Sequence, residues 1–190
     1  MNSLLLLSKA YTEPGRFYHN LYHISSMMHL AEAMEIDLFN YQIMAIWWHD
    51  AVYNPLSDNS EEDSVLWMRE VEADTDTSDL DKAGNIILCT KDHAPIFEYA
   101  KVVLDLDMAI LSAAPAVYGE YAKGVSDEYE AAGISREVYA KGRVKFLVDA
   151  LGKAEDNGVY YTKLFKPRNK QAMTNLSWEL AFWEVKNDGT

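Results

Sequence analysis

Apolar residues recur along this chain mostly at the three- and four-residue spacing of helices, and the alternation typical of strands is almost absent. The spacing predicts a short helix over 4–11, ended by the run Thr12-Glu13-Pro14-Gly15, and a longer helix over about 17–34. A third helix, for which Asp37 is the expected N-cap, leads through the apolar run 43–48 to His49 and Asp50. A polar pair therefore follows directly on a buried stretch.

The same spacing continues through the rest of the chain. Asn59 and Glu62 form an expected capping box for a fourth helix. Ser78 with Asp81 opens a fifth, which should end near His93 because a proline follows soon after. Further helices are expected over 98–112, 115–131, 135–152 and 170–185, and no repeat or linker divides the chain. We expect an all-α fold, a single domain over 1–190 built as a bundle of roughly eight or nine helices.

Composition narrows the classes of partner. The chain carries 17 lysines and arginines against 30 acidic residues, a formal net charge of -13. Such a charge repels phosphate polymers and anionic membrane surfaces, so neither a nucleic-acid polymer nor a membrane is an expected partner. The one cysteine, Cys89, excludes a disulfide framework and a thiolate metal site, and favours a reducing cytoplasm. The leucines at 4–7 are too few for the apolar region of a signal peptide. The composition does not decide whether the chain forms a homo-oligomer.

Histidines and aspartates gather at four points, and they are the ligand types of a hard or borderline divalent cation. His19 and His23 stand four apart, which on a helix would place them on one face. His49 and Asp50 end an apolar run, where a charged pair is costly unless it is paired or bound to metal. The other two points are formed by His93, Asp105 and Asp107.

Mixed imidazole and carboxylate ligation suits manganese, nickel, iron, cobalt or zinc, with magnesium as a further candidate. The absence of thiolates argues against a structural zinc. A metal of this kind can activate water near neutral pH and neutralise charge on a phosphoryl oxygen, which is what phosphoester hydrolysis requires. A histidine one helical turn from a ligand histidine could then protonate the leaving oxygen.

The order of these residues resembles the H…HD…D pattern of the HD-domain superfamily of metal-dependent phosphohydrolases. The segment Tyr18-His19-Asn20-x-x-His23 also resembles that of cyclic-nucleotide phosphodiesterases, which share the helical core. The chain is most similar, over nearly its whole length, to a family of predicted HD-superfamily hydrolases. The segments that carry this likeness are Trp47-Trp48-His49-Asp50-Ala51-Val52-Tyr53, Glu61-Glu62-Asp63-Ser64, Thr90-Lys91-Asp92-His93, Asp105-Leu106-Asp107-Met108-Ala109-Ile110-Leu111, Glu128-Tyr129, Gly142-Arg143 and Asn175-Leu176-Ser177-Trp178-Glu179-Leu180.

The resemblance implies a role for each matching residue. His23, His49, Asp50 and Asp107 would bind the metal, with Asp105 competing with Asp107 for the last position. Asp50 would also orient or deprotonate the attacking water. By the same analogy, His19 is the proton donor to the leaving group.

Five further residues are candidates for substrate binding or for support of the ligands, each with an ordinary alternative. His93 resembles the extra histidine of two-metal members, but a further histidine pair is missing, so one metal is expected; a histidine at a helix C-terminus fits equally well. Asp105 could hold a ligand histidine as a hydrogen-bond acceptor. Glu61 fits the first turn of a helix as well as it fits a site. Lys91 and Arg143 are candidate phosphate contacts, whereas the ordinary alternative is a solvated surface position, where most lysines and arginines lie.

The expected function is that of a metal-dependent phosphohydrolase, a phosphomonoesterase or phosphodiesterase acting on a small nucleotide-like phosphoester. The alternatives are an HD-fold iron oxygenase, which would need more histidines than this chain has, and a metal-stabilised regulatory or binding module without turnover. The substrate itself is not specified, because no nucleobase-reading motif is recognisable and a fold does not transfer specificity.

Overall fold

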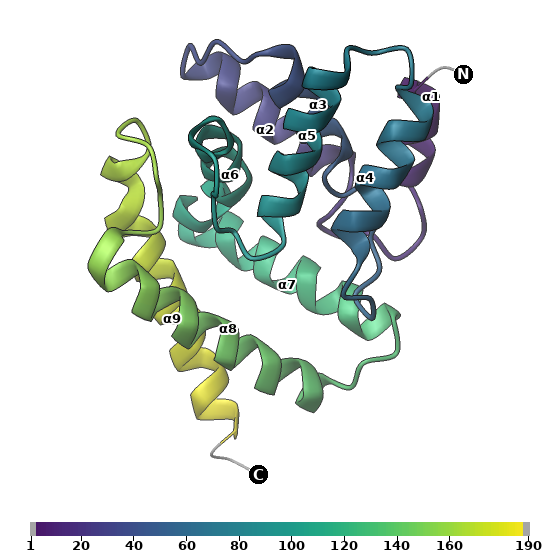
Figure 1. Cartoon of the computed structure of the whole chain (residues 1–190). Helices are drawn as coiled ribbons and strands as arrows, with labels where there is room; N and C mark the ends of the chain where they lie inside the picture. Colours follow the sequence, from purple (N-terminus) through teal and green to yellow (C-terminus); the bar gives the residue numbers. More distant parts are fainter. Residues whose placement is uncertain (1–2, 188–190) are drawn as a thin grey trace. The chain divides into compact units, whose positions relative to one another are not determined.

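The computed structural model describes residues 3–187, and it is all-helical there, which confirms the predicted fold class (Figure 1). No strand occurs in this range, and none of its helices is by itself both long and apolar enough to cross a membrane. The described residues form nine α-helices and three 3-10 helices: α1 (Ser3–Ala10), α2 (Leu21–Ala33), α3 (Asn40–Trp48), α4 (Ser60–Val71), α5 (Thr77–Thr90), η1 (Glu98–Ala100), α6 (Lys101–Asp107), η2 (Met108–Ser112), α7 (Pro115–Ala131), α8 (Arg136–Asn157), η3 (Lys166–Arg168) and α9 (Asn169–Asn187).

The helices form two compact units, Met1–Asp107 and Met108–Thr190. In the first unit α3 packs along α5, α4 covers α5, and α2 contacts both α3 and α6. The apolar run before His49 supplies part of this core, because Ile46 and Trp48 are fully buried. The Trp48 ring meets Trp67 of α4 edge-on, with 5.2 Å between the ring centroids. The end of α3 is therefore anchored deep in the first unit.

Helix α2 begins four residues later than the sequence pattern indicates. The side chain of Asn20 accepts a hydrogen bond of 2.8 Å from the backbone N–H of Tyr22, and it thereby caps the helix. Residues 17–20 form a turn ahead of this cap. The prediction that His19 and His23 share one helical face is therefore wrong, because His19 precedes the helix and only His23 lies on it.

The start of α3 also differs from the prediction. The helix begins at Asn40 with Phe39 as its N-cap, rather than after Asp37. The side chain of Gln42 accepts a hydrogen bond of 3.0 Å from the Phe39 backbone N–H, and its own amide donates to the Tyr99 carbonyl oxygen at 2.9 Å. A buried glutamine thus fixes the helix start: its bond to the Phe39 N–H is the N3-to-N-cap half of a capping box, and its bond to Tyr99 ties the helix start to a distant segment.

The next two helices begin near the predicted residues but use other contacts. Asn59 is the N-cap of α4 but makes no side-chain capping bond, and Glu62 pairs with Lys91 instead of completing a capping box. Asp76 caps α5 by accepting from the backbone N–H of Ser78 at 2.9 Å. Helix α5 ends at Thr90, so His93 lies beyond it in the following turn.

In the second unit α9 packs along α8, and both α7 and α9 contact η2. Asn175 of α9 attaches η2 through its side-chain amide, which donates to the carbonyl oxygens of Leu111 at 2.8 Å and Ala113 at 2.9 Å. Asn175 is buried, so these bonds satisfy carbonyl groups that the 3-10 helix leaves unpaired. Asn175 therefore holds η2 against α9.

A buried ion pair occupies the centre of the second unit. The Arg143 guanidinium donates to both carboxylate oxygens of Glu179, with Nε at 2.8 Å and Nη2 at 2.9 Å. Tyr118 adds a hydroxyl donor at 2.6 Å and Trp183 an indole donor at 3.1 Å. Burial opposes ionisation of Glu179, but the bonds from Arg143 outweigh it and hold the pKa of Glu179 below its usual value. The contact of Arg143 with phosphate stays a prediction, since its visible partner is Glu179.

The ion pair generates a prediction about stability. Arg143→Met should lower the free energy of unfolding by about 3–5 kcal/mol, because Glu179 would remain buried without its charge partner. Urea denaturation followed by tryptophan fluorescence measures this change. Lys141→Met is the matched control on the same helix: its pair with Glu137 is exposed, and its removal should leave the free energy of unfolding close to that of the wild type. Equal losses in the two variants would contradict the structural importance of the buried pair.

Candidate metal centre

Three helices of the first unit converge on a group of imidazoles and carboxylates. His23 lies in the first turn of α2, His49 is the C-cap of α3, and Asp107 is the last residue of α6. Each of these helices packs against the other two, which places the three side chains together. His23 and His49 are only 4% and 2% exposed, so the group is closed to solvent on the histidine side.

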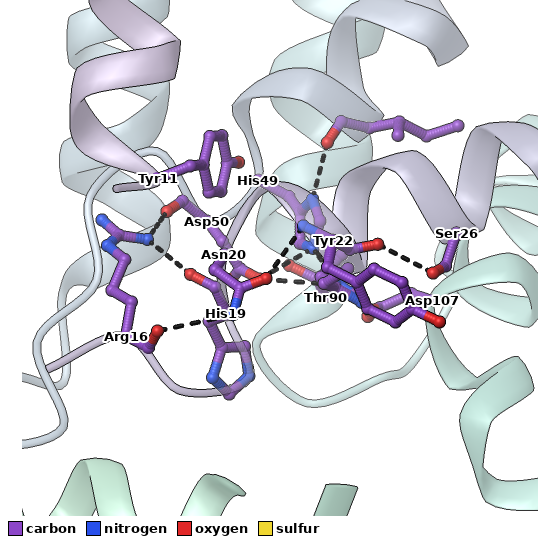
Figure 2. A network of polar contacts seen from close by, with 12 residues as sticks. Tyr11, Arg16, His19, Asn20, Tyr22, Ser26, His49, Asp50, Thr90 and Asp107 are labelled. Carbon is purple, nitrogen blue, oxygen red and sulfur yellow. Dashed lines mark hydrogen bonds and ion pairs between the residues drawn. The ribbon is translucent and has the colours of Figure 1, made fainter. Parts of the chain in front are cut away.

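The ligand atoms of His23, His49 and Asp107 all lie within 4.8 Å of one another, and the group could hold a metal ion. His23 Nε2 is 3.1 Å from Asp107 Oδ1, and the two Nε2 atoms of the histidines are 3.2 Å apart. Asp50 borders the group, with its Oδ2 3.0 Å from His49 Nε2 and 3.7 Å from His23 Nε2. Figure 2 shows His49, Asp50 and Asp107 within this polar network.

The hydrogen bonding of His49 fits a metal ligand. Its Nδ1 lies 2.9 Å from the Ile46 carbonyl oxygen, which can only accept, so Nδ1 carries a proton. In the neutral ring the lone pair is then on Nε2, the nitrogen that faces His23 and the two carboxylates. A backbone carbonyl that fixes the ring orientation in this way is the usual companion of a ligand histidine.

The electrostatics of the group also fit a bound cation. Burial opposes ionisation of Asp107, but hydrogen bonds from His23, His49 and His93 outweigh it, and the pKa of Asp107 falls well below its usual value. Burial likewise would lower the pKa of His49, yet the Asp50 and Asp107 carboxylates raise it well above its usual value. Two ionised carboxylates that lie together with little exposure to solvent are stabilised by positive charge, which either protonated imidazole or a metal ion can supply.

The two aspartates of α6 have different surroundings. Asp107 faces the histidines, whereas Asp105 is completely buried in the helix and is not part of the group that could hold a metal. Of the two alternatives that the sequence left open, Asp107 is the one whose carboxylate lies against the imidazoles. A ligand role for Asp107 and a supporting role for Asp105 remain proposals.

His93 and His19 flank the group. His93 Nε2 is 3.3 Å from the second oxygen of Asp107, and its backbone has a φ of 47°, which is uncommon for a residue other than glycine. The His19 ring stacks on Tyr53 with 4.3 Å between the ring centroids, and it lies 6.1 Å from the His23 ring. His19 is also close enough for its charge to help lower the pKa of Asp50, a shift that burial opposes and His49 chiefly produces. The site therefore has a third and a fourth imidazole at its edge.

Glu61 and Lys91 belong to the same unit but not to the group itself. Glu61 is half-buried at the start of α4, and burial raises the pKa of its carboxyl, with a smaller contribution from Asp50. Lys91 pairs with Glu62 at 2.7 Å and donates to the Asp58 carbonyl oxygen, so it holds the loop before α4 to the end of α5. The role of either residue in binding substrate remains a prediction.

Two residues that support the site, Arg16 and Tyr11, could not be inferred from the sequence. Arg16 donates to the backbone carbonyl oxygens of His19 and Asp50 (Figure 2). Tyr11 donates through its hydroxyl to the Trp47 carbonyl oxygen at 3.0 Å. Most of these partners lie more than thirty positions away along the chain. A single sequence contains no spacing from which such contacts could be inferred.

No protein-family model, curated protein or solved structure matches this chain. Its likeness to HD-domain hydrolases therefore depends on the motif residues and stays a prediction.

The geometry predicts metal binding that requires Asp107. Protein purified without chelator should contain about one transition-metal ion per chain. The Asp107→Asn variant should not bind the ion, because asparagine has nearly the same shape as aspartate but lacks the charge of a carboxylate ligand. Elemental analysis and calorimetric titration with Mn²⁺ measure the stoichiometry and affinity. Asp63→Asn removes an exposed carboxylate from α4 and should bind like the wild type. A wild-type protein that neither contains nor rebinds manganese, nickel, iron, cobalt or zinc would refute the centre.

Proposed function

We propose that the chain is a metal-dependent phosphohydrolase of the HD-domain type, acting as a phosphomonoesterase or phosphodiesterase on a small nucleotide-like phosphoester. The observation that carries the proposal is the convergence of His23, His49 and Asp107 within 4.8 Å, with Asp50 beside them. The order of these residues along the chain supports it, because it is the order in which the HD-domain pattern presents them.

The donor set supports one divalent transition metal, with manganese, nickel, iron, cobalt and zinc as candidates and magnesium as a weaker one. His23, His49, Asp50 and Asp107 would hold it. Such a cation lowers the pKa of a bound water and offsets charge that develops on a phosphoryl oxygen.

Two residues of the chain would then divide the proton transfers. The Asp50 carboxylate, at the edge of the group, would accept a hydrogen bond from the attacking water and orient it toward phosphorus. His19 would donate a proton to the departing oxygen. Its stacking on Tyr53 supports this role, because a ring held by a neighbour needs less reorganisation when the substrate binds.

A reducing compartment such as the cytoplasm is part of the proposal. The one cysteine, Cys89, is buried within the described part of the chain, and the ligand set contains no thiolate that would depend on redox state. A homo-oligomer remains compatible with this function.

The proposed function predicts different roles for His19 and His23. His19→Ala should keep the metal and slow turnover by about a hundredfold or more, the range of general acid–base catalysis. His23→Ala should lose both metal and turnover. Metal content and the rate of hydrolysis of an aryl phosphate are measured on the same preparations.

His29→Ala is the matched control for both variants. It removes an exposed histidine from α2 and should change neither metal content nor rate. Equal metal loss in the His19 and His23 variants would assign His19 as a ligand and would contradict its role as the acid.

The proposed function also predicts the class of substrate. A net charge of -13 repels phosphate polymers, which would have to lie across the acidic surface. A small phosphoester can instead approach the metal without contacting the rest of that surface. We expect metal-dependent hydrolysis of at least one mononucleotide, cyclic nucleotide or aryl phosphate, and far slower cleavage of DNA and RNA at moderate salt. Faster cleavage of polynucleotides would contradict the charge argument. No hydrolysis of any phosphoester by metal-loaded protein would instead favour the oxygenase or the module without turnover.

A further inference from the structure

Arg16 lies in the segment between α1 and α2 as a buried cation whose partners are mainly backbone carbonyl groups. Its side chain is only 4% exposed. Nη1 donates to the carbonyl oxygens of Asp50 at 2.6 Å and His19 at 3.1 Å, and Nη2 donates to that of Ala51 at 2.9 Å. Its carboxylate partner is Glu13, 3.6 Å away and largely exposed, so the guanidinium leaves the carboxylates of the metal centre available for a cation.

These carbonyl groups belong to the two segments that carry the proposed chemistry. Asp50 and Ala51 follow the end of α3, where carbonyl groups have no partner within the helix and the helix dipole favours a cation. His19 belongs to the turn that precedes α2. Arg16 therefore joins the backbone of the proposed water-orienting residue to the backbone of the proposed proton donor (Figure 2).

The surroundings of Arg16 favour arginine over lysine. Its guanidinium carbon lies 5.3 Å from the centre of the Tyr11 ring and 5.6 Å from that of Tyr53. Tyr53 is also the ring on which His19 stacks. A planar fork can bond three carbonyl groups while it lies against aromatic rings, whereas an ammonium group is a point charge on a flexible stem.

We propose that Arg16 is a positioning residue of the metal centre, which sets the placement of Asp50 and of the His19 turn relative to the ligand histidines. The proposal rests on the metal centre of the proposed function. It assigns to Arg16 a role beyond stability: the geometry of the bound metal should depend on its three carbonyl contacts.

The test compares Arg16→Lys with Tyr11→Phe, since both residues bond backbone carbonyl groups at the end of α3. Tyr11→Phe removes the hydroxyl that bonds the Trp47 carbonyl oxygen, but it leaves Arg16 in place. Arg69→Lys, on the exposed pair with Asp81, controls for the exchange of arginine for lysine. The readouts are the thermal melting temperature, the Mn²⁺ affinity by calorimetry, and the visible absorption bands of Co²⁺-loaded protein, which report coordination geometry.

Arg16→Lys should bind Mn²⁺ about 10- to 100-fold more weakly, the usual effect of losing a residue that orients ligands, and should change the Co²⁺ bands. Tyr11→Phe should lower the melting temperature while leaving affinity and bands close to those of the wild type. Arg69→Lys should match the wild type throughout. If Arg16→Lys does not fold, Arg16→Gln, whose amide keeps two N–H donors, replaces it with the same expectation.

Wild-type affinity and bands in the Arg16 variant would overturn the positioning role and leave the metal centre standing. Equal changes in the Arg16 and Tyr11 variants would also overturn it, because general loosening of the helix end would then explain both. A wild-type protein that binds neither Mn²⁺ nor Co²⁺ would overturn the metal centre itself, and the role of Arg16 with it.

Discussion

The first unit depends on how it accommodates two carboxylates, those of Asp50 and Asp107, that lie together with little exposure to solvent. Asp50 and Asp107 both stay ionised beside His23 and His49, although burial alone would favour their neutral forms. An ionised carboxylate away from water is tolerated only when it is paired, hydrogen-bonded or bound to a cation. The helices α2, α3 and α6 each begin or end at this point. The packing of these helices therefore brings the carboxylates together and also supplies the imidazoles that stabilise their charge.

The end of α3 shows how the surrounding chain supports this arrangement. Side chains that are remote in sequence bind the backbone there: Tyr11 bonds the Trp47 carbonyl, Arg16 bonds those of Asp50 and Ala51, and the Ser64 hydroxyl accepts from the Val52 N–H at 3.0 Å. The backbone around His49 is thus held from two sides, by the segment before α2 and by α4. A ligand placed on so constrained a backbone loses little entropy when it binds a metal.

Prediction from sequence was accurate for features that depend on the spacing of apolar residues or on the order of histidines and aspartates along the chain. The helical fold and the convergence of His23, His49 and Asp107 belong to this class, because apolar spacing and motif order survive in a single chain. Helix starts were less accurate, as at α3, where Gln42 rather than Asp37 supplies the contact. Arg16 could not have been found at all, since its partners at Asp50 and Ala51 lie 34 and 35 positions away.

The second unit shows that residues that stand out in the sequence can have a packing role. Asn175 bonds η2 and Arg143 pairs with Glu179, so these motif residues already have structural functions. In the first unit, two cations are engaged in a similar way: Arg16 bonds carbonyl groups and Lys91 bonds Glu62. A phosphoester that approaches an acidic protein in which Arg16 and Lys91 are already paired needs another source of positive charge. A divalent ion held by His23, His49 and Asp107 would supply it, and this is why the proposed chemistry requires a metal rather than an arginine-lined pocket.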